Sequence, residues 1–179
     1  LSENQETMKQ KIVDGLLERF SFQQVVLGEI ETSLSGCKLS TSSGVDRIEE
    51  HSSLVQMFEQ VFQETLDQGR TVVWPESEIS YGIASTAMSG LISATRADLC
   101  VFVPLLSSRG KPVGVLGILC RGKSAKRKEL VDKMNNIGAG LGCALDHWSK
   151  VRTNLVSSSM SRLKKYYSGT RSIVILAAI

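Results

Sequence analysis

Cysteine and histidine, which often bind metals or act in catalysis, are scarce in this sequence. The four cysteines are Cys37, Cys100, Cys120 and Cys143. They include no CxxC pair, so the spacing of zinc ligands is absent. The only histidines are His51, where a helix is expected to begin, and His147, which lies beside Trp148 on a later helix. Neither indicates a metal site. We therefore expect no metal and no cofactor, and the cysteine pattern is typical of a reducing, cytoplasmic setting.

A secretory signal sequence is also missing, and the first residue is not methionine, so we expect the chain to be part of a longer protein. Its 179 residues are enough for one domain with flanking helices. With 42% hydrophobic and 22% charged residues, the composition is that of a soluble globular protein, and it excludes a disordered or fibrous chain.

The net charge of +3 conceals an uneven distribution. Residues 1–98 contain 7 Lys and Arg against 15 Asp and Glu, whereas residues 99–179 contain 14 against 3. A basic half often has an electrostatic partner. We do not expect nucleic acid, because the basic residues are not interleaved with aromatic ones and no DNA-binding motif occurs. Solvated helix faces and a membrane surface both remain open.

Two apolar runs, residues 101–106 and 113–120, flank the turn sequence SSRGKP. Their β-branched residues and the turn residues Gly110 and Pro112 predict a β-hairpin. Because both runs are almost entirely apolar, the hairpin should lie in the interior of a sheet, covered on both faces. Pro104 cannot donate a backbone hydrogen bond, so it should lie at a bulge or on an open side of its strand.

The first 45 residues predict a helix and a second hairpin. Residues 3–20 form an amphipathic helix. Its buried stripe consists of Met8, Ile12, Leu16 and Phe20. Residues 23–31 and 37–42 have strand composition on either side of the turn sequence SLSG, and they predict the hairpin.

A second helix is predicted to begin at Ser53, where Gln56 lies at capping-box spacing, and to end at Gly69. Residues 71–74 form a short strand that is followed by proline. Residues 76–97 have no clear periodicity and are rich in small residues, so they predict a short helix with loops.

A long helix is predicted from about Ser124 onward. Its apolar residues recur at alternating spacings of four and three, at Leu130, Met134, Ile137, Leu141, Ala144, Trp148, Val151 and Leu155. This stripe is typical of a helix that pairs with another helix as in a coiled coil. Gly138, Gly140 and Gly142 weaken a helix intrinsically, so we expect them to mark close packing against the sheet.

The predicted order of elements resembles the GAF domain family over residues 8–150. Three passages carry the resemblance: FQQVVLGEIE after the first helix, LDQGRTVVWPE around a short strand, and VFVPLLSSRGKPVGVLGIL before the long helix. The resemblance implies an α+β fold with a central antiparallel sheet of five or six strands. The N- and C-terminal helices would pack on one face, and a small-molecule pocket would lie on the other. We divide the chain into a GAF-like domain, residues 1–150, and a basic C-terminal segment, residues 151–179.

The residues that carry the known chemistries of this family are missing or altered in this sequence. Bilin-attaching members have Cys-His or Asp-x-Cys-Phe patterns, but no cysteine here precedes histidine, and Val101 follows Cys100 where phenylalanine would be needed. The cyclic-nucleotide signature of the Asn-Lys-x-Phe-Asp type is absent. Members that reduce free methionine sulfoxide carry redox cysteines in loops, whereas Cys100 lies within a strand, where burial raises the pKa of a thiol. We therefore predict that the protein is not an enzyme.

Two functions remain open. In the first, the module senses a small-molecule effector in a cavity under residues 76–97, lined by Trp74, Tyr81, Met88, Arg96 and Cys100. The aromatic residues would supply apolar walls with polar tips, and Arg96 would bind an anion. The alternative, which we favour for each of these residues taken singly, is that Trp74 and Met88 belong to an ordinary core and that Arg96 is solvated.

In the second, the chain is a regulatory or assembly module, and its terminal helices form a parallel homodimer through a helical bundle. The candidate interface residues are Met8, Ile12, Leu16, Phe20, Leu141, Trp148 and Leu155. The absence of any ligand signature favours this function.

The end of the chain is basic and then apolar. Residues 147–179 contain no acidic residue, and a basic stretch precedes the apolar run SIVILAAI. The basic residues are Lys150, Arg152, Arg162, Lys164, Lys165 and Arg171. This pattern is typical of a cytoplasmic domain that continues into a transmembrane helix, here beginning near Ser172. A short strand or an unstructured end is the alternative, and the basic segment could also bind an anionic membrane surface.

Overall fold

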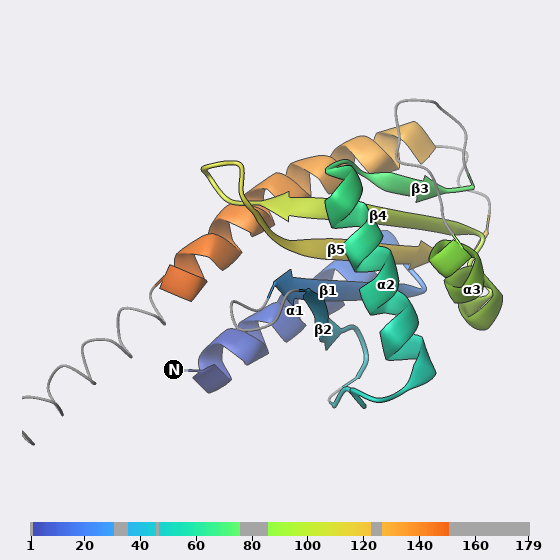
Figure 1. Cartoon of the computed structure of the whole chain (residues 1–179), viewed down its shortest axis with the longest axis horizontal. Coiled ribbons are helices and arrows are strands. Elements are labelled where there is room, and N and C mark those ends of the chain that lie inside the picture. Colours follow the sequence, from blue (N-terminus) through green and yellow to red (C-terminus); the bar gives the residue numbers. More distant parts are fainter. Residues whose placement is uncertain (1, 31–35, 46, 76–85, 123–126, 151–179) are drawn as a thin grey trace, which may run out of the picture.

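The computed structural model describes residues 2–30, 36–45, 47–75, 86–122 and 127–150. In chain order the elements are α1 (Ser2–Phe20), β1 (Gln24–Ile30), β2 (Cys37–Ser42), α2 (Ser53–Gln68), β3 (Val72–Trp74), α3 (Thr86–Thr95), β4 (Leu99–Leu106) and β5 (Pro112–Cys120). A C-terminal helix follows, of which residues 127–150 are described. Figure 1 shows α2 crossing in front of the strands, and the C-terminal helix (orange) running behind them.

The strands form one antiparallel sheet in the order β2-β1-β5-β4-β3. The α+β fold and the predicted hairpin are therefore confirmed, since β4 and β5 are neighbours in the sheet interior. Strand β3 pairs only with Cys100–Phe102 of β4. Pro104 consequently lies beyond the end of β3, and on that side it has no partner among the described strands, whereas on the other side it pairs with Val115 of β5.

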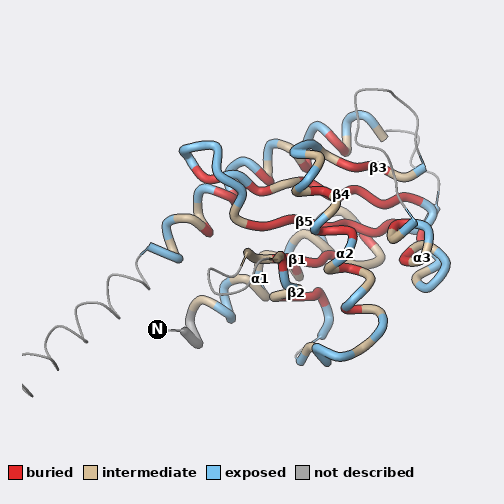
Figure 2. The backbone as a smooth tube through the Cα atoms, in the orientation of Figure 1, coloured by how far each residue is buried: buried red, intermediate tan, exposed pale blue. Residues whose placement is uncertain are grey.

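Each face of the sheet has its own apolar core, because successive side chains of a strand point to opposite faces. We call one face the terminal-helix face. It is covered by α1 and the C-terminal helix, and its core includes Val13, Val101, Ile118 and Met134. The other is the α2–α3 face, whose core includes Phe58, Phe62, Met88 and Phe102. Figure 2 shows that burial is concentrated along the strands between these two helix layers.

Two of the three helix glycines allow the C-terminal helix to lie against the sheet. A Cβ atom on Gly138 would lie 2.7 Å from the side chain of Val103, and one on Gly142 would lie 2.3 Å from the carbonyl oxygen of Leu106. Gly140 has nothing within 4 Å of the corresponding position and is exposed. The predicted close packing is thus confirmed at Gly138 and Gly142, and wrong at Gly140, which lies on the outer side of the helix.

The predicted buried stripe of α1 needs correction. Val13 is the fully buried residue of this helix, whereas Met8 is 47% exposed. Successive residues of a helix are about 100° apart around its axis. A stripe chosen one residue away from the true buried position therefore runs along the side of the helix and not along the face that contacts the sheet. The stripe from Met8 to Phe20 therefore follows the flank of α1 rather than its buried face.

The predicted start of α2 at Ser53 is confirmed, but the predicted capping residue is wrong. The N-cap is Ser52, whose side chain accepts a hydrogen bond from the backbone nitrogen of Val55 at 3.2 Å, and not Ser53. The end of the helix is confirmed, because Gly69 adopts the left-handed conformation, with φ of 62°.

The predictions for the end of the chain lie outside the described residues. Residues 151–179 include the basic segment, Leu155 and the proposed span from Ser172. Within the ranges given above, no helix has the length and apolar character that crossing a membrane requires.

Candidate functional site

Three of the five predicted effector-binding residues lie together on the α2–α3 face. Trp74 of β3 is the register partner of Cys100 of β4, and Met88 of α3 belongs to the same apolar cluster. Met88 and Cys100 are 1% and 0% exposed, whereas Trp74 is only partly buried. Among the described residues this cluster is packed core, as the alternative interpretation allowed. Tyr81 lies outside the described residues.

Arg96 does not join this buried cluster. It follows α3 in the left-handed conformation, with φ of 55°, and its backbone nitrogen donates to the carbonyl oxygen of Ile92 at 2.7 Å. The residue is exposed, as expected of a solvated arginine. That an effector binds under residues 76–97 stays a prediction.

Burial makes three of the four cysteines poor nucleophiles. Burial raises the pKa of the Cys100 thiol to about 12, with Cys120 as a smaller cause. Burial, followed by the carboxylates of Glu29 and Glu59, raises the pKa of Cys37 to about 12, and burial raises that of Cys120 to about 11. These groups stay protonated at neutral pH. The remaining cysteine, Cys143, is exposed on the C-terminal helix.

A hollow that the sequence did not predict lies at the edge of the terminal-helix face. We call it the edge groove, a cavity of about 510 Å³ between residues 69–71, the end of β4 and the C-terminal helix. The β4 side contributes Val103, Pro104, Leu106 and Ser107, and the helix contributes Asn135, Ala139 and Cys143. The cavity exists because β3 is only three residues long, and no other described strand pairs with this part of β4 on that side.

One hydrogen bond crosses the edge groove. The hydroxyl group of Thr71 donates to the side-chain oxygen of Asn135 at 2.6 Å, and it ties the segment before β3 to the C-terminal helix. Within the described ranges, no three His, Cys, Asp or Glu side chains are grouped closely enough to hold a metal ion.

The candidate dimer residues are divided between a flank of the terminal helices and the core of the chain itself. Ile12, Leu16 and Trp148 are partly buried against the terminal-helix core, and Leu141 is 7% exposed. Phe20 stacks on Phe22 of its own chain, with ring centroids 5.2 Å apart, so it contributes to the core and not only to a surface.

Three solved structures place this fold among known proteins. No protein-family model matches the sequence, and no curated protein is significantly similar to it. The GAF domain of A. aeolicus nlh2, in an inactive state, has a TM-score of 0.56 at 16% identity, covering 82% of this chain and 85% of its own. The GAF domain of a two-component sensor histidine kinase from Bacillus halodurans has a TM-score of 0.54 at 13% identity, covering 79% and 95%.

The third is an enzyme, the type II free methionine-R-sulfoxide reductase from Thermoplasma acidophilum. Its TM-score is 0.55 at 18% identity, and the match covers 81% of this chain and 94% of that one. At these identities the likenesses establish the fold. The chain therefore has a GAF-like fold, as the sequence resemblance implied.

The prediction that the protein is not an enzyme is corrected by the same finding. That prediction rested on the absence of family signatures around Cys100. A reductase with this fold shows that the architecture accommodates catalysis, so missing signatures elsewhere in the family do not exclude an activity.

Proposed function

We propose that this GAF-type module acts in regulation or assembly as a parallel homodimer, with α1 and the C-terminal helix forming the interface. The observation that supports this proposal is the apolar flank left on the two helices after the sheet has been covered. On the C-terminal helix, Val131, Met134 and Leu145 fill the sheet-facing positions and are at most 4% exposed. Leu130 and Ile137 are only partly buried.

The leftover residues form the interface seam, which we define as Met8, Ile12, Leu16, Leu130, Ile137 and Trp148. Complete burial of one such aliphatic side chain contributes roughly 1.5–3 kcal/mol. Several of them, contributed by both protomers, give an association energy large enough to offset part of the entropy lost on dimerisation. Leu130, Ile137 and Trp148 are separated by 7 and 11 residues, so they lie along one side of the C-terminal helix, and a helical bundle around a two-fold axis buries them most completely.

Sedimentation velocity with charged variants of the seam tests the proposal. Trp148→Glu and Met8→Glu should convert the dimer to a monomer, because each introduces a charge that cannot be buried. Asn136→Glu is the matched control, since Asn136 is exposed and lies on another side of the same helix. Circular dichroism checks that each variant is folded. A wild-type protein that sediments as a monomer at high micromolar concentration contradicts the proposal.

A further inference from the structure

The walls of the edge groove are apolar. Val103, Pro104 and Leu106 line the β4 side, and Ala139 lines the helix side. Leu106 is 39% exposed, one of three large hydrophobic residues among those described that are exposed to this extent. An apolar surface of this kind, open beside a strand edge, favours a ligand that has a hydrocarbon body.

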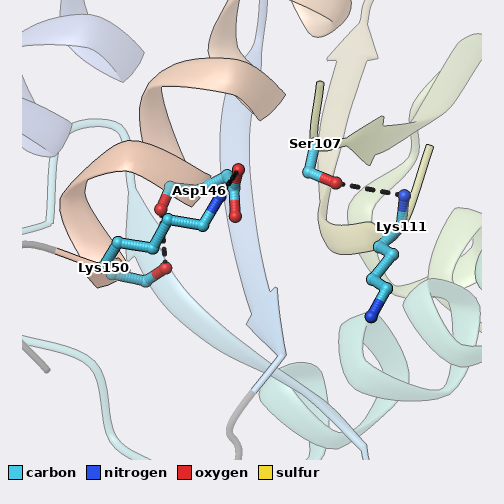
Figure 3. A network of polar contacts seen from close by, with 5 residues as sticks. Ser107, Lys111, Asp146 and Lys150 are labelled. Atoms are coloured by element: carbon cyan, nitrogen blue, oxygen red, sulfur yellow. Dashed lines mark hydrogen bonds and ion pairs between the residues drawn. The ribbon is translucent and has the colours of Figure 1, made fainter. Parts of the chain in front are cut away.

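The polar groups of the edge groove present hydrogen-bond donors. Arg70 lines it and has no carboxylate partner among the described residues. The oxygen of Asn135 already accepts from Thr71, so its NH₂ group remains to donate. The oxygen of Ser107 accepts from the backbone nitrogen of Lys111 at 3.1 Å, which leaves the hydroxyl proton for another acceptor. Figure 3 shows this contact at the turn between β4 and β5.

Among the described residues, no carboxylate side chain lines the edge groove. Asp132 and Asp146 belong to the same helix but are not among the lining residues. Asp146 is also paired with Lys150, as Figure 3 shows, so its charge is balanced locally. A ligand group that only accepts hydrogen bonds and carries a negative charge therefore matches the lining, and a carboxylate is the simplest such group.

We propose that the edge groove binds a small aliphatic monocarboxylate, with its carboxylate at Arg70 and Asn135 and its hydrocarbon chain against Val103, Pro104 and Ala139. This site lies on the terminal-helix side of the sheet, whereas the predicted effector cavity lies on the α2–α3 face. It also involves a different flank of the C-terminal helix from the interface seam. The proposal is therefore independent of the dimer.

Cys143 provides the probe for a test, because it lines the edge groove and is the exposed one of the four cysteines. The full chain is treated with iodoacetamide, a neutral reagent, and the rate of Cys143 alkylation is followed by peptide mass spectrometry. We expect octanoate to slow this reaction in a saturable manner. Octanamide, which lacks the charge, should protect about tenfold less well at equal concentration, since one charged hydrogen bond accounts for a difference of that order. Acetate keeps the carboxylate but lacks the hydrocarbon chain, and each buried CH₂ group contributes about 0.8 kcal/mol, or about fourfold in affinity, so acetate should give no protection at that concentration.

Two variants locate the binding. Arg70→Gln should raise the concentration of octanoate needed for half-protection by about tenfold. Arg109→Gln, on the exposed turn between β4 and β5, is the matched control and should leave that concentration unchanged. Ala139→Phe should fill the groove and abolish protection by octanoate. If octanoate gives no protection in the wild-type protein, or if octanamide protects equally well, the proposal is overturned whatever the variants do. Equal protection of Arg70→Gln and wild type would also overturn it.

Discussion

Gly142→Ala tests how closely the C-terminal helix approaches the sheet. The added Cβ atom would lie 2.3 Å from the carbonyl oxygen and 2.7 Å from the nitrogen of Leu106. Ordinary contact begins at 3.4 Å, so the helix or the strand must move by about 1 Å. Both obstructing atoms belong to the backbone, so no side chain can rotate away. Overpacking of this kind costs about 1–3 kcal/mol, against a gain of up to about 1 kcal/mol from the better helix propensity of alanine.

We therefore expect Gly142→Ala to lower the free energy of unfolding by about 1 kcal/mol, which shifts the midpoint of urea denaturation to lower concentration by about 0.5 M. Gly140→Ala is the control in the same helix. Its Cβ atom meets nothing within 4 Å, so it should raise stability by about 0.5–1 kcal/mol. The reasoning is refuted if the two variants shift the midpoint in the same direction.

Two further predictions concern the N-cap of α2 and the buried thiols. Ser52→Ala should cost about 1 kcal/mol in urea denaturation, because the hydrogen bond to Val55 is lost, and Ser53→Ala should be nearly neutral. A larger loss for the second variant would mean that the cap is wrongly assigned. The pKa of Cys100 is raised from 9.0 to about 12, so its contribution to stability is complete below pH 9 and is lost as the pH rises toward 12. Between about pH 8 and about pH 10.5, the free energy of unfolding should therefore fall by less in Cys100→Ala than in the wild type. An equal fall in both proteins would contradict the burial of this thiol.

The core hairpin could be predicted from the sequence because its signals are local. Two apolar β-branched runs around a glycine-containing turn define β4 and β5 with little ambiguity. The end of α2 at Gly69 was equally clear, since a glycine after an amphipathic segment usually ends a helix. Pro104 also allowed a prediction about the neighbouring strand, because a residue without an N–H group is expected at a bulge or on an open side of its strand.

The faces of the terminal helices were harder to predict. The heptad stripe combined residues from two sides of the C-terminal helix, namely Met134 on the buried face and Ile137 on the flank. Periodicity locates an apolar sector but does not say which part of it contacts the sheet and which part is left over. The identity of Gly142 as the contact point depended on the position of Leu106, which no local pattern specifies.

The edge groove could not be predicted from the sequence. It is formed by segments that begin at residues 69, 103 and 135, and it depends on the short length of β3. Nothing in the sequence around Arg70 indicated a binding site, because an arginine after a helix C-cap is usually solvated. One indication was present in the sequence: TVVW is too short to cover a neighbouring strand of eight residues, so part of that strand had to remain open.

Cys143 allows the central claim, a homodimer through the interface seam, to be tested on the unmutated chain. A nitroxide spin label on this exposed thiol reports the distance between the two protomers by pulsed electron paramagnetic resonance. Cys143 lies on a different flank of the C-terminal helix from Ile137, so two helices packed through the seam should hold the labels about 20 to 35 Å apart. We expect a single distance in that range, which disappears in Trp148→Glu. A sample without dipolar modulation, or labels less than about 15 Å apart because the edge grooves face each other, would contradict the account.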